Sequence, residues 1–341
     1  MKKLLSLILA ALLLTSLLAG CGGRTDAPKA VADGRARPSS CGRLQVVDGK
    51  LCSESGEAVM LRGVSLNGLV TSESFLNDES FRELAEDDGV NLIRLAMYTY
   101  GVGSVGYCTK GDKEKHKADV DAGVELARQH DMYVIIDWHI LSDGDPNTYA
   151  DEALLFFAEM AEKYGGYDNV LYEICNEPNG VDWPTVKAYA ERVIPVIREK
   201  APAAVVLVGN PDWSKDLRSV ADDPLAFDNV LYSLHFYAAT HGQDLRVLTE
   251  DLSRSGLPIF VTEFGVTASN GGLPRDLESA DEWIGLLERE QISYCMWAWA
   301  KAPEACSAIR YTVPKYSGFA PEDYTETGLW LLETLKNHNT R

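Results

Sequence analysis

Eight short apolar runs recur along the chain, and each is rich in Val, Ile, Leu, Phe or Tyr. They span 59–64, 91–98, 133–139, 170–175, 204–209, 229–237, 258–264 and 293–300. Near-continuous apolar runs are typical of parallel strands that are buried on both faces. Helix-like stretches lie between most of them, at 78–88, 117–131, 149–164, 184–200, 243–255 and 276–290, and a last one follows at 326–338. This alternation predicts a single α/β domain folded as a (β/α)8 TIM barrel.

The rival arrangement is an open, doubly wound sheet, in which a Gly-rich turn that binds phosphate follows the first strand. No such turn follows 59–64, which favours the closed barrel. Ahead of the first strand, Asp48-Gly49 lies between strand-like residues, and this pair is typical of a two-residue hairpin turn. We therefore expect a short N-terminal hairpin over 46–51 that closes one end of the domain.

The N-terminus has the pattern of an export signal. Lys2 and Lys3 precede an almost wholly apolar stretch at 4–18, which is shorter than the roughly 20 residues that cross a bilayer. The following Leu18-Ala19-Gly20-Cys21 resembles a lipobox, in which the chain is cut before the cysteine and lipid joins its sulfur. We expect a signal peptide at 1–20 and a secreted bacterial lipoprotein held to the cell membrane through Cys21. The alternative is ordinary secretion with an incidental cysteine.

Residues 21–40 are rich in Gly, Pro, Ala, Arg and Asp and contain no aromatic residue. Such a segment buries little surface, so we predict a flexible linker over 21–40 and a folded domain over 41–341. The net charge of -19 repels phosphate backbones and argues against nucleic acid as a partner. We expect the protein to act as a monomer.

Six cysteines follow the lipobox: Cys41, Cys52, Cys108, Cys175, Cys295 and Cys306. Two of them, Cys175 and Cys295, lie inside apolar strand-like runs, where a free cysteine behaves as a small buried hydrophobe. An exported chain can form disulfides. The two pairings considered are Cys41–Cys52, across the hairpin, and Cys295–Cys306, between a strand and a loop. Connectivity does not follow from sequence, and the pairing stays open.

Polar and aromatic residues gather at the carboxyl ends of the predicted strands. They are Asn67, Tyr98, His139, Asn176, Glu177, His235, Tyr237, Glu263 and Trp297. In a barrel those ends form one face, where active sites lie. Any one of these residues has an ordinary structural explanation, but their convergence on one face predicts a functional site.

Two of these residues, Glu177 and Glu263, come from different strands and suit glycoside hydrolysis. That reaction needs one carboxyl group to protonate the leaving oxygen and a second, ionised one to attack the anomeric carbon. No Lys or Arg adjoins either glutamate in sequence, although Arg94 is in a position to reach across the barrel. The alternative use of these glutamates with His139 and His235 is a metal site, which no His-x-x-x-His or Cys-x-x-Cys spacing supports. We predict neither a metal nor a cofactor.

The motifs around these residues are recognisable. Residues 170–178 end in Asn176-Glu177-Pro178, residues 136–139 end in Asp137-Trp138-His139, and 234–238 contains His235 and Tyr237. Residues 258–265 carry Glu263 in Val-Thr-Glu-Phe-Gly. In this order and spacing the motifs resemble glycoside hydrolase family 5, the cellulase family, over about residues 44–310. The nearest resemblance is to bacterial endo-β-1,4-glucanases.

The resemblance implies roles for the matching positions. Glu177 is expected to be the general acid/base and Glu263 the nucleophile of a retaining, double-displacement mechanism. Asn176 is expected to bond the 2-hydroxyl of the sugar, while Arg94 and Tyr237 hold the nucleophile.

Other positions are implied to contact sugars directly. His139 and His235 are expected to line the subsite of the cleaved sugar, and Trp297 to stack on that sugar. Trp213 is expected to stack on the leaving-group side. From these matches the resemblance implies an endo-acting hydrolase whose substrate is a β-1,4-glucan of the cellulose type.

Several positions bear on the choice of substrate. Lys301 and Glu304 resemble polar contacts to a more distant sugar. Asn67 stands where many relatives carry His, Thr71 where some carry a stacking Trp, and Met296 where Asn is common. These differences leave a β-mannanase, or another β-1,4-glycanase of the family, as the alternative enzyme. An alternative of a different class is a catalytically silent surface lipoprotein that binds glycans, against which the two intact glutamates argue.

Overall fold

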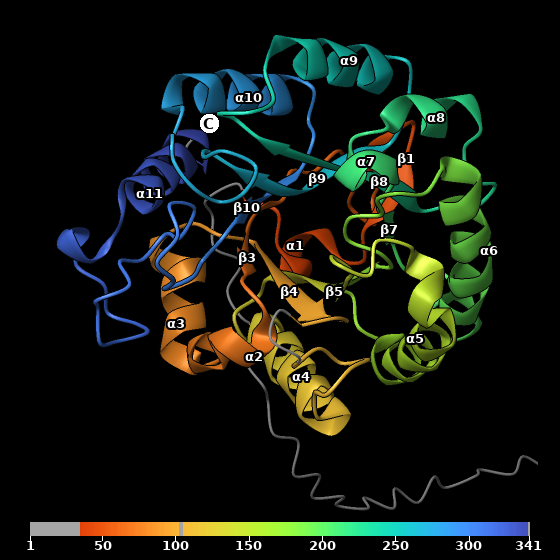
Figure 1. Cartoon of the computed structure of the whole chain (residues 1–341), viewed down its shortest axis with the longest axis horizontal. Coiled ribbons are helices and arrows are strands. Elements are labelled where there is room, and N and C mark those ends of the chain that lie inside the picture. Colours follow the sequence, from red (N-terminus) through yellow and green to blue (C-terminus); the bar gives the residue numbers. More distant parts are fainter. Residues whose placement is uncertain (1–34, 102–104, 340–341) are drawn as a thin grey trace, which may run out of the picture. The chain divides into compact units, whose positions relative to one another are not determined.

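The computed structural model describes residues 35–101 and 105–339. Eight parallel strands form a closed barrel in the order β10-β3-β4-β5-β6-β7-β8-β9, and helices surround it (Figure 1). The strands are β3 (Arg62–Leu66), β4 (Leu92–Tyr98), β5 (Tyr133–His139), β6 (Val170–Glu173), β7 (Val206–Val208), β8 (Val230–Tyr237), β9 (Ile259–Gly265) and β10 (Tyr294–Trp297). The predicted (β/α)8 barrel is confirmed.

The long helices match the predicted ones closely. They are α4 (Lys113–Gln129), α5 (Ala150–Tyr164), α6 (Trp183–Lys200), α9 (Gln243–Arg254), α10 (Leu277–Arg289) and α11 (Glu326–Asn339). Aspartates cap the first turns of three of them, because the side chains of Asp112, Asp182 and Asp276 accept backbone N–H groups there. The cap at Asp112 explains why α4 begins four residues before the predicted 117.

The shorter elements differ more from the predictions. The helix predicted at 78–88 divides into α3 (Asp78–Arg82) and a π-helical turn, η2 (Glu83–Asp87). No helix was predicted after the fifth strand, where the chain forms α7 (Pro211–Ser214) and α8 (Leu217–Asp222). The remaining short elements are α1 (Pro38–Cys41), α2 (Leu69–Ser72), η1 (Glu73–Phe75), η3 (Pro146–Tyr149) and η4 (Pro321–Asp323).

The N-terminal part of the domain closes the amino ends of the barrel strands. Strands β1 (Gln45–Val47) and β2 (Lys50–Cys52) form the predicted hairpin, in which Asp48 and Gly49 both have positive φ. Leu44 and Leu51 pack on an apolar cluster inside the barrel that also contains Leu92, Tyr133, Leu171, Leu207, Leu231 and Phe260. Because this end is filled, the polar residues at the opposite strand ends face the open mouth of the barrel.

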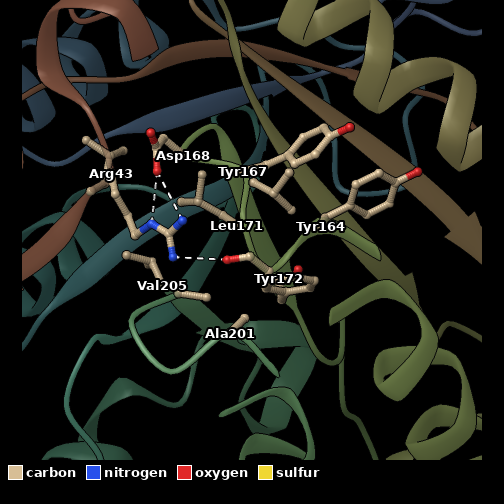
Figure 2. Close-up of a pocket in the computed structure, with 12 residues that line it drawn as sticks. Arg43, Tyr164, Tyr167, Asp168, Leu171, Tyr172, Ala201 and Val205 are labelled. Atoms are coloured by element: carbon tan, nitrogen blue, oxygen red, sulfur yellow. Dashed lines mark hydrogen bonds and ion pairs between the residues drawn. The ribbon is translucent and has the colours of Figure 1, made fainter. Parts of the chain in front are cut away.

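Polar contacts hold this N-terminal segment in place. Arg43 forms an ion pair with Asp168, at 3.0 Å, in the loop before β6, beside Tyr164 and Tyr172 (Figure 2). The Tyr133 hydroxyl donates to the carbonyl of Gly42 at 2.7 Å. The segment is therefore tied to the barrel at several points around its closed end.

The flexible linker predicted over 21–40 ends earlier than residue 40. Arg37 is only 3% exposed, and its guanidinium donates to the Ala85 carbonyl at 3.1 Å. Asn91 donates to the carbonyl of Ala36 at 3.1 Å. Residues 35–40 thus belong to the packed domain. The predicted signal peptide and the lipidation of Cys21 lie outside the described residues.

The six cysteines that the structure describes are all free. Cys175 and Cys295 are buried, as predicted. Neither suggested disulfide forms. Cys295 faces the apolar cluster at the closed end of the barrel, whereas Cys306 packs with Trp297 near the mouth. Cys52 pairs across the hairpin with Gln45. Across the described ranges, every helix is too short or too polar to cross a membrane.

Candidate active site

The open mouth of the barrel brings together the side chains that the sequence places at strand ends. β4 supplies Arg94, β5 supplies His139, β8 supplies His235 and Tyr237, and β9 supplies Glu263. Asn176 and Glu177 come from the loop directly after β6, and Trp297 ends β10. All of these except Glu177 are buried. The predicted convergence on one face is therefore what the barrel produces.

The two glutamates face each other across the mouth. One carboxylate oxygen of Glu177, one of Glu263 and a ring nitrogen of His235 all lie within 4.8 Å of one another. Retaining glycosidases hold their carboxyl groups about 5–5.5 Å apart, and inverting enzymes about 6.5–9.5 Å apart to leave room for a water. The spacing between Glu177 and Glu263 fits the retaining geometry.

Arg94 is the centre of a fully buried ionic network. Its guanidinium donates to Glu173 at 2.7 Å, to Glu263 at 3.0 Å and to Asn176 at 2.6 Å. A fourth contact, at 2.9 Å, joins it to Asp137. Burial by itself lowers the pKa of Arg94, but the surrounding carboxylates outweigh it and raise that pKa well above its ordinary value. Arg94 is therefore a permanent cation that fixes the positions of its partners.

Both oxygens of the Glu263 carboxylate are held from inside the barrel. Arg94 donates to Oε2, and the Tyr237 hydroxyl donates to Oε1 at 2.7 Å. Burial and the charge of Glu263 raise the pKa of Tyr237 well above its ordinary value, so the phenol keeps the proton that it donates. The carboxylate is thereby fixed in one orientation toward the mouth.

Glu177 has a different environment. Burial raises its pKa to about 7, although the nearby cations Arg94 and Lys215 act in the opposite direction. Its Oε1 lies 2.8 Å from Nδ1 of His235. A carboxyl group with this pKa is protonated in a large fraction of molecules near neutral pH, which suits a general acid.

The two histidines of the site are neutral. Burial lowers the pKa of both His139 and His235 to about 4. His139 lies 2.6 Å from Asp137 through Nδ1 and stacks on Trp297 with ring centroids 5.3 Å apart. Tyr98 also packs against His139, with ring centroids 4.3 Å apart and the two rings tilted by 46°. The peptide bond after Trp297 is cis.

Two cavities lie among the residues at the mouth of the barrel. One is lined by Glu177 together with Trp213, Lys215, His241 and Ser269. The other is lined by Tyr98 together with Asn67, Thr71, Ala302 and Glu304. Glu177 therefore borders one cavity, and the positions that bear on the choice of substrate line the other.

Trp213 lies at the rim of the first cavity in an uncommon backbone conformation. Asp212, Trp213 and Ser214 have φ values of 57°, 55° and 56°. Three consecutive non-glycine residues with positive φ carry strain, which folded structures retain mainly at functional sites. Trp213 is 48% exposed, and the ammonium group of Lys215 lies over its ring, 5.0 Å from the centroid. The predicted stacking role suits this position.

Lys301 is placed differently from the other predicted residues. Its ammonium group lies over the Tyr316 ring, 3.7 Å from the centroid, which is the geometry of a cation–π contact. It does not line either cavity described above. Glu304, which was grouped with it, does line the second cavity.

Several titratable residues of the site were not predicted from the sequence. Asp137 and Glu173 are fully buried partners of Arg94, and Lys215 and His241 line the cavity beside Glu177. A signal for the first two exists, since each is a lone acid inside an apolar strand run. A buried charge requires a partner, and Arg94 is the buried cation that meets this need. Lys215 and His241 lie in loops and carry no comparable signal.

The trio of Glu177, His235 and Glu263 has the composition of a metal-ligand set. The electrostatics argue for another use, because the permanent cation Arg94 lies 3.0 Å from Glu263. A metal ion bound to that carboxylate would meet the repulsion of the guanidinium in a buried setting. The arrangement suits acid/base and nucleophilic chemistry better.

Comparisons with known proteins agree with this geometry. The family model for cellulase, glycosyl hydrolase family 5, matches residues 52–303. Endoglucanase A of Butyrivibrio fibrisolvens is 42% identical over 298 residues, which cover 86% of this chain and 68% of that protein. An endoglucanase of Clostridium saccharobutylicum is 39% identical over 341 residues, covering 99% of this chain and 73% of that protein. The crystal structure of the catalytic domain of Thermobifida fusca endoglucanase Cel5A, in complex with cellotetraose, superposes with a TM-score of 0.83 at 34% identity, covering 88% of this chain and all of that domain.

Proposed function

The chain belongs to the cellulase family, glycosyl hydrolase family 5, and is a glycoside hydrolase, and we propose that it cleaves β-1,4-glucan internally with Glu177 as acid/base and Glu263 as nucleophile. The observation that carries the proposal is the pair of carboxylates within 4.8 Å, one anchored by Arg94 and the other with a raised pKa. The similar proteins are endoglucanases, and one of them was crystallised with cellotetraose.

The first half of the reaction forms a covalent glycosyl-enzyme. Glu263 attacks the anomeric carbon while Glu177 gives its proton to the glycosidic oxygen, and the bond between sugar and leaving group breaks. The orientation of Glu263 by Arg94 and Tyr237 reduces the reorganisation that the attack requires. The leaving group departs as a neutral alcohol along the cavity that contains Trp213.

The second half releases the sugar with retained configuration. Glu177, now ionised, removes a proton from a water molecule, and the resulting nucleophile attacks the anomeric carbon and frees Glu263. The negative charge of Glu263 is absent from the covalent intermediate, so it does not oppose the ionisation of Glu177 at that stage. Both glutamates return to their starting protonation states.

Two cavities at the barrel mouth support internal cleavage. One is bordered by Glu177 and Trp213 and the other by Tyr98 and Asn67, so a glucan chain has room to extend beyond the cut bond. All of the proposed catalytic groups come from one barrel, and we propose that the enzyme acts as a monomer.

A substrate panel tests the proposed function. The full chain, purified in mild detergent, is incubated with soluble β-1,4-glucan, mannan, xyloglucan and xylan, and released reducing sugar is measured. We expect activity to be led by β-1,4-glucan, with products of mixed length that indicate internal cleavage. If activity were highest on mannan, the proposed mechanism would stand and the proposed substrate would be wrong. The absence of activity on every polymer would favour the alternative of a glycan-binding protein without catalytic activity.

We also propose that the enzyme is exported and anchored to the cell membrane by lipid on Cys21. The support is the sequence of Lys2, Lys3, the apolar stretch at 4–18 and Leu18-Ala19-Gly20-Cys21. In a bacterial host given radiolabelled palmitate, we expect the wild-type chain to carry label and to fractionate with membranes. The Cys21→Ser variant should carry no label. Equal labelling of the two chains would contradict the proposal.

A further inference from the structure

His235 is held between two partners at its two ring nitrogens. Nδ1 lies 2.8 Å from Glu177 Oε1, and Nε2 lies 2.8 Å from the hydroxyl oxygen of Thr262 in β9. His235 is 1% exposed and Thr262 is fully buried, so both contacts form away from water. The tautomer of His235 determines in which of these two hydrogen bonds the imidazole is the donor and in which it is the acceptor.

A neutral imidazole carries one N–H donor and one bare acceptor nitrogen. Because burial keeps His235 neutral at the pH where Glu177 titrates, only one of its nitrogens has a proton. A proton on Nδ1 makes His235 a donor to Glu177, and the Thr262 hydroxyl must then donate to Nε2. A proton on Nε2 makes His235 an acceptor toward Glu177 and a donor to Thr262.

The Thr262 hydroxyl distinguishes the two tautomers. Its only hydrogen-bond partner among the residues that the structure describes is Nε2 of His235. If Nε2 carried the proton, the proton of the buried hydroxyl would have no acceptor, a situation that folded proteins avoid. If Nδ1 carries the proton, the Thr262 hydroxyl donates to Nε2 and Nδ1 donates to Glu177. Each polar atom of these two hydrogen bonds then has a partner.

We propose that Thr262 is a positioning residue that fixes the proton of His235 on Nδ1, so that the imidazole donates to Glu177 in both halves of the reaction. The inference rests on the proposed acid/base role of Glu177. Since Oε1 accepts from His235, the transferable proton of Glu177 resides on Oε2, the oxygen left for the glycosidic bond. After transfer, the same N–H group stabilises the carboxylate that activates water.

Several charges act on this arrangement from the surrounding strands and loops. The charged groups that face Glu177 or His235 are Arg94, Glu173, Lys215 and Glu263, and the other titratable groups there are Asp137, Tyr237 and the neutral His139. Glu173, whose Oε1 lies 3.9 Å from Nε2, attracts a proton to the nitrogen that faces Thr262. The hydroxyl of Thr262 is thus the group that opposes the pull of Glu173 on the imidazole proton.

The test compares Thr262→Val, which keeps the shape and removes the hydroxyl, with Thr262→Ser, which keeps the hydroxyl. In Thr262→Val the proton shifts to Nε2, toward Glu173, and Glu177 loses the N–H donor to its ionised form. The alkaline limb of kcat/KM should then move up by about one pH unit. We expect kcat on β-1,4-glucan to fall about tenfold, with KM changed less than about twofold.

Two controls separate this role from packing. Thr262→Ser should keep the wild-type pH profile and lie within about twofold of wild-type kcat. Thr249→Val removes another fully buried hydroxyl, which bonds the Leu245 carbonyl in α9 outside the barrel, and should leave the pH profile unchanged. Equal losses in Thr262→Val and Thr262→Ser, or an unmoved alkaline limb in Thr262→Val, would overturn the proposal.

A measurement on the wild-type enzyme reports the tautomer of His235 directly. Nitrogen-15 NMR of the labelled enzyme near pH 7, with His235 assigned by comparison with His235→Gln, is expected to show Nδ1 protonated and Nε2 bare. The opposite assignment would overturn the proposal even if the enzyme hydrolyses glucan. An enzyme that is silent on glucan while its Nδ1 is protonated would instead remove the proposed function.

Discussion

Glu263→Gln is expected to lower kcat on β-1,4-glucan by at least about 10⁴-fold, the largest effect of any single substitution in this chain. An amide oxygen is a far weaker nucleophile than a carboxylate, so no glycosyl-enzyme forms. The substitution keeps the shape of the side chain and an acceptor for either Tyr237 or Arg94. Reducing-sugar release over long incubations measures the loss, and circular dichroism checks that the barrel remains folded.

A matched control removes a carboxylate of similar burial elsewhere. Glu290 is 9% exposed and forms an ion pair with Arg254 at 2.7 Å outside the site. Glu290→Gln should keep kcat within about twofold of wild type, because a change away from the reacting atoms affects stability more than catalysis. If Glu263→Gln retained more than about 1% of wild-type turnover, far above the level expected without a nucleophile, Glu263 would not be the nucleophile.

Glu177→Gln is expected to lower kcat on β-1,4-glucan by about 10³-fold while sparing the first step on activated substrates. An aryl β-cellobioside with a very acidic phenol leaves without a proton, so Glu263 still attacks it at a rate near that of wild type. Deglycosylation lacks its base and becomes slow. Stopped-flow absorbance should therefore show a burst of phenol close to one equivalent of enzyme, followed by slow turnover.

The pH dependence gives the same assignment independently. Burial raises the pKa of Glu177 to about 7, and its acid role requires the protonated form. Wild-type kcat/KM on β-1,4-glucan should therefore be full below that pH and fall as pH rises through it. In Glu177→Gln this alkaline limb should be absent from the residual kcat/KM on β-1,4-glucan. An unchanged limb in the variant would assign the pKa to another group.

The barrel and most of its mouth could be predicted from the sequence for a simple physical reason. Parallel strands buried on both faces read as continuous apolar runs, and the first polar residue after each run lies at the carboxyl end of a strand. Closing the sheet brings these ends together, so Glu177 and Glu263 meet although they are far apart in sequence. The turn at Asp48-Gly49 could also be predicted, because it depends only on the two adjacent residues that form it.

The remaining features depend on contacts between distant segments. The packing of Arg37 against Ala85 carries no local signal in a stretch that resembles a linker. The left-handed run at Trp213 is imposed by its surroundings against local preference, and the position of Lys301 over Tyr316 depends on how a long loop folds back. Cys295 and Cys306 are close in sequence, but the first packs at the closed end of the barrel and the second near the mouth. Their spacing in the chain does not indicate this separation.

The closed end of the barrel has a practical consequence for enzyme engineering. Arg35 donates to the carbonyl of Ala85 at 2.8 Å, and Asn339 donates to that of Gly89 at 2.9 Å, so both ends of the described chain reach the same short segment before β4. That segment lies at the end opposite the glutamates. Immobilisation on a bead, or fusion to another protein, at either of these points leaves the mouth unobstructed. The proximity of the two points also makes a circularly permuted version, joined by a short loop, a reasonable construction.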